Sequence, residues 1–254
     1  MISGHMRSAG QHRPLLISFS GIDGSGKSTQ ITMLRAILEQ SGYRTVLLAF
    51  WDDVVVGTRF REGFVHKVYK SERGVGSPDR PVQRRDKNVR KWYLNLARHA
   101  LYLLDALNLR RVLRSADYRG IDVIVMDRYI YDELANLPLG NKLSQRFAKW
   151  VGTRVVPQPD LALLLDADPD AARARKPEYP LDFMRECRRW YARLADLLGT
   201  LTVIPPSGVE GAHQAILAKI QTLLPLAESA RREKSNCIVR PDVPEISLRP
   251  VIRT

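Results

Sequence analysis

One eight-residue segment constrains this chain more than any other. Residues 21–28 read GIDGSGKS and fit the spacing G-x-x-x-x-G-K-[ST] in full. The glycines let the backbone wrap closely around phosphate oxygens, and the N–H groups of such a loop form an anion-binding nest. Lys27 supplies a positive charge to the β- and γ-phosphates of a nucleotide, and the Ser28 hydroxyl is a ligand for Mg²⁺. The residues expected to contact the nucleotide are Gly21, Ile22, Asp23, Gly24, Ser25, Gly26, Lys27, Ser28 and Thr29.

The flanks of this segment provide the context that such a loop needs. Residues 15–20 (LLISFS) form a short apolar run between Pro14 and the loop, which is typical of a buried strand. Apolar residues at 31, 34, 37 and 38 then repeat at helical spacing, and Ser41-Gly42 ends that helix. A helix that begins near Lys27 points its positive dipole end at the loop. The sequence therefore predicts nucleotide binding here rather than a glycine-rich turn.

The rest of the chain alternates apolar strands with helices. A long helix with an apolar face at 92–107 follows a loop at 71–86, and a last helix is expected at about 211–225. Strands that alternate with helices favour a parallel sheet covered on both faces, so we predict a three-layer α/β fold. The further strands are expected at 45–50, 121–127, 161–166 and 201–204.

Length and composition suit one sizeable α/β domain or two small ones. Of the 254 residues, 44% are hydrophobic, which is enough for a buried core. The periodic pattern extends over residues 15–225. Residues 1–14 form a polar leader without the apolar region of a secretory signal. Residues 226–254 mix charges and prolines without a pattern, and we expect both ends to be disordered.

The sequence gives no sign of a membrane span, a disulfide framework or a metal cluster. No stretch approaches the ~18 consecutive apolar residues that a membrane span needs. The two cysteines, Cys187 and Cys237, lack the spacing of a framework or of metal ligands, and the five histidines are scattered. A reducing, cytoplasmic location fits these features best.

The net charge of +13 is concentrated in one region. Residues 59–119 hold 16 Lys and Arg against 6 Asp and Glu, without the Lys/Arg runs of a DNA-binding arm. Such a concentration suits a cleft for an anionic substrate. An ordinary solvated basic surface and a nucleic-acid site are the alternatives, of which nucleic acid is the less favoured.

A second acidic residue is expected beside the loop. Asp127 closes the strand IDVIVMD (121–127) at the edge where ligands bind in open α/β sheets. A carboxylate there can hold the hydrated metal ion of a nucleotide. Arg128 follows directly and is a candidate phosphate clamp. The alternative is that Asp127 caps the next helix and Arg128 is a surface charge.

Four motifs in order resemble the thymidylate kinase family. They are FSGIDGSGKSTQ (19–30), DRY (127–129), PDLALLLDADPDAARAR (159–175) and LDFMRECRRWYARLA (181–195), and the resemblance covers about residues 15–225. It implies a P-loop NTPase fold with a monophosphate cleft and a lid at about 168–182. It also implies ATP-dependent conversion of dTMP to dTDP with Mg²⁺, and dimers formed through core helices, for which the apolar face of 92–107 is a candidate.

The resemblance also implies roles for individual residues. Asp23 would contact the acceptor sugar, Ser28 and Asp127 the metal ion, and Arg128 the acceptor phosphate. The family places a catalytic arginine in the loop or in the lid, and the loop here carries Gly24 and Ser25 at the candidate positions. The catalytic charge beyond Lys27 is therefore expected from two lid arginines. These are Arg173 and Arg175, with Lys176 behind them.

The chain departs from the family on the acceptor side. Ser20 stands where the family usually has Glu, and WDDVVVGTRFREG (51–63) replaces its Arg-Pro segment. In LYLLDALNLRR (101–111), Leu or Ala occupies the position of the expected base-reading arginine. Asp52 and Tyr102 are the candidate acceptor contacts, the latter by stacking on a base.

Three functions are compatible with these features. The first is a kinase that transfers the γ-phosphoryl group of ATP to dTMP or a related monophosphate. The second is a P-loop kinase for another small phosphate or hydroxyl acceptor, which the altered acceptor motifs favour. The third is a nucleotide-binding regulator or a nucleic-acid-associated ATPase that uses residues 59–119. Asp127-Arg128 together with an arginine-bearing lid argues against the third, because a pure switch has no need of both.

Overall fold

The computed structural model describes residues 13–56, 92–115 and 118–226. Within these ranges, the side chains of residues 92–94 and 115 are not described. The expected loop at 71–86 and nearly all of the expected leader and tail lie outside the described residues, as does about half of the basic region 59–119.

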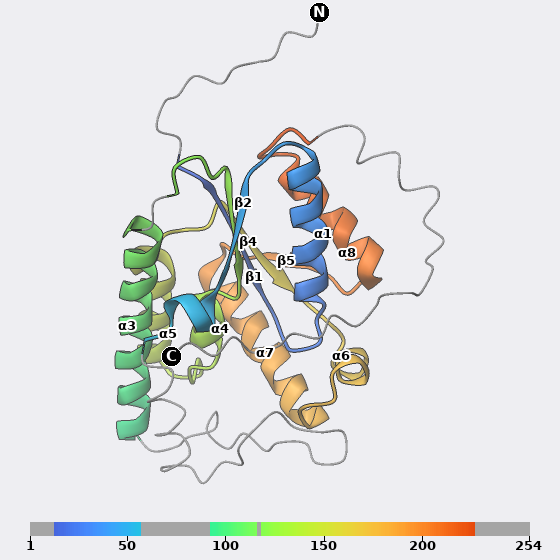
Figure 1. The fold of residues 1–254 in the computed structure, drawn as a ribbon. Helices are drawn as coiled ribbons and strands as arrows, with labels where there is room; N and C mark the ends of the chain where they lie inside the picture. Colours follow the sequence, from blue (N-terminus) through green and yellow to red (C-terminus); the bar gives the residue numbers. More distant parts are fainter. Residues whose placement is uncertain (1–12, 57–91, 116–117, 227–254) are drawn as a thin grey trace, which may run out of the picture.

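Five parallel strands form the central sheet (Figure 1), in the order β2-β3-β1-β4-β5. This confirms the α/β prediction, and each expected strand is present. Four of the five residues of β3 are buried because helices cover both faces of the sheet, which explains its continuous apolar sequence. The strands are β1 (Leu15–Ser20), β2 (Thr45–Ala49), β3 (Val123–Asp127), β4 (Leu161–Leu165) and β5 (Thr202–Ile204).

Helices cover the two faces of the sheet unequally (Figure 1). On one face, α1 (Lys27–Gln40) and α8 (Gly208–Ile220) pack on Ile17 and Phe19 of β1. The opposite face carries the larger core, to which β1 contributes Leu16. Four helices cover that face: α3 (Trp92–Ser115), α4 (Ile130–Ala135), α5 (Lys142–Trp150) and α7 (Leu181–Leu198).

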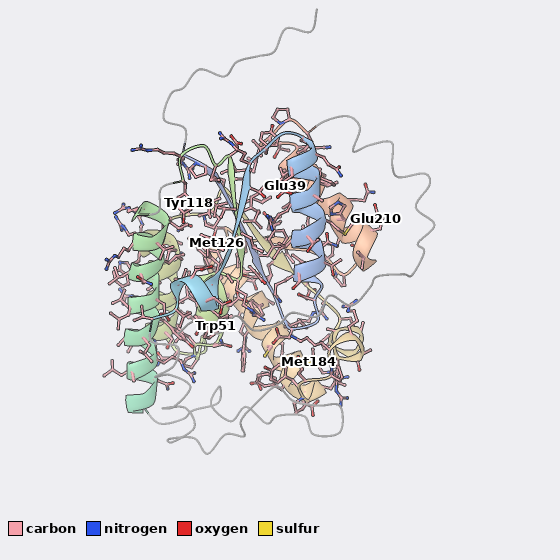
Figure 2. All side chains as sticks on the ribbon, viewed as in Figure 1. Glu39, Trp51, Tyr118, Met126, Met184 and Glu210 are labelled. Carbon is pink, nitrogen blue, oxygen red and sulfur yellow. The ribbon has the colours of Figure 1, made fainter. Side chains whose placement is uncertain are left out.

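Side chains follow this layering. Met126 of β3 lies fully buried inside the molecule, whereas Glu39 of α1 and Glu210 of α8 lie on the outside (Figure 2). Two single π-helical turns, η1 (Phe50–Val54) and η3 (Val151–Val155), join the larger core. No helix in the described ranges is long and apolar enough to cross a membrane.

The sheet order sets the location of the site. The chain leaves β1 between two neighbours, β3 and β4, whose own connections leave the same edge. Ligands bind at such a point of reversal in open α/β sheets. The loop at 21–26, Arg128 and helix α6 (Pro169–Arg175) all follow the carboxyl ends of these three strands.

Candidate active site

The loop after β1 has the backbone conformation of an anion-binding nest. Gly24 (φ 77°) and Gly26 (φ 90°) lie in the left-handed region, which glycine adopts without steric cost. Gly26 is the N-cap of α1, and no side chain caps this helix end. The N–H groups of the first turn of α1 are therefore left without a side-chain cap, which suits the binding of phosphate oxygens.

Lys27 is held by the loop itself. Its ammonium Nζ donates to the carbonyl oxygens of Gly21 and Ile22, both at 2.9 Å, and lies 3.5 Å from the Ser25 hydroxyl. Burial, and secondarily the positive charge of Arg128, lowers the pKa of Lys27 to about 8. The ammonium is thus pre-placed at the centre of the loop, where phosphate oxygens can replace the two carbonyl oxygens.

Asp127 and Ser28 have the donor chemistry for a hydrated Mg²⁺. Asp127 ends β3 and lies in register with Phe19 of β1, so its carboxylate stands next to the strand that leads into the loop. Ser28 lies in the first turn of α1 and is exposed. Within the described ranges, no group of three or more His, Cys, Asp or Glu side chains could enclose a metal ion. One carboxylate and one hydroxyl suit Mg²⁺, which keeps several waters and binds substrate phosphates.

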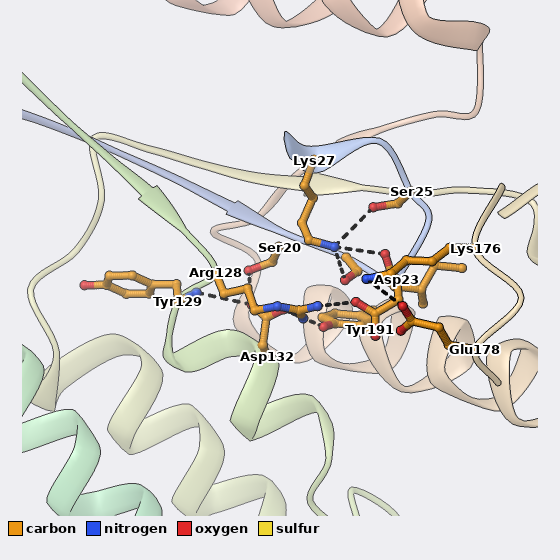
Figure 3. Close-up of polar contacts among 12 residues, drawn as sticks. Ser20, Asp23, Ser25, Lys27, Arg128, Tyr129, Asp132, Lys176, Glu178 and Tyr191 are labelled. Carbon is orange, nitrogen blue, oxygen red and sulfur yellow. Dashed lines mark hydrogen bonds and ion pairs between the residues drawn. The ribbon is translucent and has the colours of Figure 1, made fainter. Parts of the chain in front are cut away.

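Arg128 lies at the centre of a network of polar contacts (Figure 3). Its backbone is left-handed, with φ 67°, and its N–H donates to the Phe19 carbonyl oxygen at 2.9 Å. Its guanidinium pairs with Asp23 of the loop and, at 3.0 Å, with Asp132 of α4. Burial opposes the charged form, but nearby negative charge, led by that of Asp132, outweighs it and raises the pKa of Arg128.

Asp132 is a member of this network that the sequence did not single out. A carboxylate four residues after an arginine has the spacing of a helical ion pair, which was the available signal. The isolated spacing is common, and only the fold shows that Asp132 is buried beside the loop.

The expected lid lies directly on the loop. A Cβ at Gly24 would collide with the carbonyl oxygen of Ala172 in α6. Arg175 donates from Nε to the Gly24 carbonyl oxygen at 3.0 Å. The Nε of Arg173 is buried without a hydrogen-bond partner among the described residues. The structure therefore brings the α6 segment and Arg175 to the loop.

The two candidate acceptor contacts are placed less favourably. Asp52 is exposed on η1. Tyr102 is buried in the larger core, and burial, followed by the charge of Glu133, raises its pKa well above the ordinary value. Its ring therefore packs in the core, which corrects the expectation that it lies open for a base to stack on. Neither residue joins the Arg128 network.

Buried carboxylates near Tyr102 were not anticipated. Asp105 of α3 is fully buried and accepts a hydrogen bond from the Val56 N–H at 3.1 Å. Glu133 of α4 is also buried and interacts with Tyr102. Nothing in the sequence marked these two residues as buried, because their burial depends on how α3 packs on α4.

A cavity of about 230 Å³ lies beside the loop, between the end of β4 and α7. Its lining includes Ile22, Tyr191 and the ion pair between Asp166 and Arg188, whose two hydrogen bonds measure 2.7 and 2.6 Å. A larger hollow of about 490 Å³, lined by Leu139, Arg193 and others, does not reach the loop. The smaller cavity is therefore the one that belongs to the site.

Comparisons with known proteins support one family. No family model matches the chain. A thymidylate kinase of Bifidobacterium longum subsp. infantis is 30% identical over 224 residues, which cover 83% of this chain and 87% of that protein. A probable thymidylate kinase of Archaeoglobus fulgidus is 24% identical over 223 residues, 85% of this chain and 100% of that protein. A probable thymidylate kinase of Pyrococcus abyssi is 28% identical over 219 residues, which cover 82% of this chain and 97% of that protein.

A solved structure supports the same fold. The structure of thymidylate kinase from Candida albicans matches 83% of this chain and 92% of its own length, with a TM-score of 0.54 and 19% identity.

Proposed function

The chain belongs to the thymidylate kinase family, and on this premise we propose that it transfers the γ-phosphoryl group of ATP to dTMP, forming dTDP. The observation that carries the proposal is that two cations meet one loop at the edge of the sheet: Lys27 donates to its carbonyl oxygens, and Arg128 pairs with its Asp23. One cation faces the loop that takes the ATP phosphates, and the other lies where an acceptor phosphate can approach.

In this proposal each residue has a part in positioning and neutralising charge. The N–H groups of residues 24–28 and the Lys27 ammonium bind the β- and γ-phosphates of ATP. Arg128 binds the acceptor phosphate, and Asp23 turns from Arg128 to a sugar hydroxyl. Arg173 and Arg175 neutralise the migrating phosphoryl group when the lid excludes water. Mg²⁺, held through Ser28 and Asp127, would supply further charge neutralisation at the phosphates.

A second acceptor class is kept because the chain departs from the family on the acceptor side. Ser20 stands where the family usually has Glu, and residues 51–63 replace its Arg-Pro segment. Both changes fall on the side of the cleft that takes the acceptor. Another monophosphate is therefore the alternative.

A panel of acceptors tests these proposals. ADP release with ATP and Mg²⁺ is measured for dTMP, dUMP, dCMP, dAMP, dGMP and a sugar phosphate. We expect dTMP to give the highest kcat/KM. A higher value for another monophosphate favours the second candidate, and ATP hydrolysis that responds only to added single-stranded DNA excludes both.

The metal assignment has its own test. Asp127→Asn removes a negative charge beside the hydrated cation, so we expect lower activity and a higher Mg²⁺ concentration at half-maximal rate. An unchanged Mg²⁺ titration would make Asp127 a helix cap only.

We also propose that the protein acts as a homodimer. The outer face of α3 exposes four leucines, Leu96 (63%), Leu101 (37%), Leu104 (51%) and Leu107 (49%). A leucine stripe on a helix that already packs its other face on the core suits a second copy of the same helix.

A further inference from the structure

Asp132 is a buried carboxylate that four donors share. It accepts hydrogen bonds from the Ser20 hydroxyl at 2.6 Å, the Tyr191 hydroxyl at 2.7 Å and the Tyr129 N–H at 3.2 Å, besides its pair with Arg128. The donors come from the end of β1, from α7 and from the β3–α4 connection (Figure 3). A carboxylate fixed by so many packed elements has little freedom to move.

The two carboxylates that hold Arg128 differ in this respect. The Asp132 side chain is 4% exposed, whereas that of Asp23 is 28% exposed and lies in the loop. An incoming phosphate can displace a partly exposed loop carboxylate but cannot reach one enclosed by Ser20 and Tyr191. Asp132 is therefore the permanent partner of Arg128, and Asp23 is the exchangeable one.

We propose that Asp132 is a positioning residue for the phosphoryl acceptor. It holds Nη1 of Arg128, so that Nη2, which contacts Asp23 in the free protein, remains directed at the place of the acceptor phosphate. Ser20 and Tyr191 fix Asp132 in turn. This inference rests on the proposed function, because it assumes that Arg128 binds the acceptor.

The position of Ser20 explains why the carboxylate comes from α4. Ser20 ends β1 and its hydroxyl reaches Asp132 directly, so a carboxylate extending from position 20 would occupy nearly the same place. The family that the sequence resembles usually has Glu there. In this chain α4 supplies the charge and β1 only a hydroxyl donor. A negative charge therefore remains beside Arg128, but it comes from Asp132 of α4 and not from position 20.

This relocation makes a rescue experiment possible. Asp132→Ser removes the carboxylate, and Ser20→Glu combined with Asp132→Ser returns it from β1. We expect Asp132→Ser to lower kcat/KM for the acceptor by roughly 10- to 100-fold, because a misplaced binding group costs that much, with the KM for ATP changed by less than about twofold. The double variant should recover most of the loss.

A matched control separates this effect from general destabilisation. Asp160 also accepts from a backbone N–H, that of Leu16 at 2.9 Å, and pairs with Arg13 at the opposite end of β1. Asp160→Ser should leave the KM for the acceptor unchanged. If the double variant does not fold, Asp132→Asn decides, because it keeps the shape and loses the charge. Unchanged acceptor kinetics in Asp132→Ser or Asp132→Asn would overturn the inference.

The proposed function and this inference fail in different ways. The wild-type acceptor panel decides the function, and the variants are assayed with whichever monophosphate the wild type phosphorylates. Melting temperatures test the pairing of Asp132 with Arg128 even if the wild type phosphorylates none of these monophosphates. Asp132→Ser should destabilise the wild type more than the Arg128→Met variant, in which Asp132 has lost its cation and keeps only the three neutral donors. Equal destabilisation in both backgrounds would overturn the inference.

Discussion

The phosphate-binding role proposed for Lys27 comes at the expense of the stability of the free protein. Its ammonium is buried, and the oxygens that it meets in the described part of the chain are two carbonyls and a hydroxyl, all neutral. Burial first, and Arg128 second, lowers its pKa to about 8. The protonated form therefore opposes folding below pH 8, and this opposition is relieved as the pH rises from about 8 towards 10.5. Bound phosphates would supply the missing negative charge.

The first prediction is a pH dependence. Since kcat/KM reports ionisations of the free enzyme, kcat/KM for ATP should fall as the pH rises through about 8, where Lys27 loses its proton. The kcat should fall only at higher pH, because bound phosphates raise the pKa of the ammonium. Initial rates across pH 6 to 10.5 test this. Identical profiles for both constants would contradict it.

Lys27→Met completes this test. Turnover should fall by roughly 10²–10³ or more, since a donor to the transferred phosphate is lost. The free protein should melt at a higher temperature than the wild type at pH 7 and lack the stability gain that Lys27 contributes above pH 8.

The second prediction concerns Gly24. Alanine there would collide with the Ala172 carbonyl oxygen and would adopt a left-handed backbone at φ 77°. We expect Gly24→Ala to prevent α6 from docking and to reduce kcat strongly. Gly42→Ala is the matched control, because its φ is 85° and no atom lies within 4 Å of the added Cβ. Both variants bear a strain of about 1 kcal/mol, but only Gly24→Ala should lose activity. Equal kcat values in the two would exclude lid docking at this glycine.

At the scale of elements, α6 is the part of the expected lid that lies on the loop after β1. Its first turn is capped by Asp168, which accepts from the Ala171 N–H at 3.0 Å, and its last turn carries the two arginines. Arg185 of α7 pairs with Asp170 at 3.3 Å and steadies the helix from outside. The cap at one end and the contact with the Gly24 carbonyl oxygen at the other fix α6 beside the loop.

The third prediction tests these arginines. Arg173→Ala or Arg175→Ala should lower kcat by roughly 10³ or more, as the loss of an arginine finger does. The affinity for ATP should fall much less, because the contact tightens mainly as the transition state forms. Single-turnover rates and ATP binding measured separately test this. Arg185→Ala is the control and should retain near-normal kcat. Near-normal kcat in both lid variants would move the role to Arg128.

At the scale of the molecule, the exposed face of α3 leads to the fourth prediction. Leu104→Glu places a charge in the centre of the proposed dimer contact, so it should give a monomer by light scattering while the wild type is a dimer. Leu143→Glu is the control, since Leu143 is more exposed but lies on α5. A wild-type monomer, or a dimer that both variants keep, would exclude α3 as the interface.

Local spacing was enough to predict the sheet and the phosphate loop. Each strand is an apolar run whose sequence already shows burial, and the loop depends on glycines and Lys27 within eight residues. Asp127 and Arg128 could be placed because the carboxyl ends of parallel strands meet at one edge. The strands and the loop could be predicted because each is marked by a pattern within one short segment of the chain.

Tertiary structure alone decided which polar groups of the site contact one another. Asp132 lies 112 residues from Ser20 and 59 from Tyr191, and Arg175 lies 151 residues from Gly24. The burial of Tyr102 and Asp105 likewise depends on how α3 packs. Their positions along the helix do not by themselves indicate that both side chains are buried. Hydrogen bonds and desolvation act over a few ångströms in space, and so only the folded chain determines the partners of Arg128.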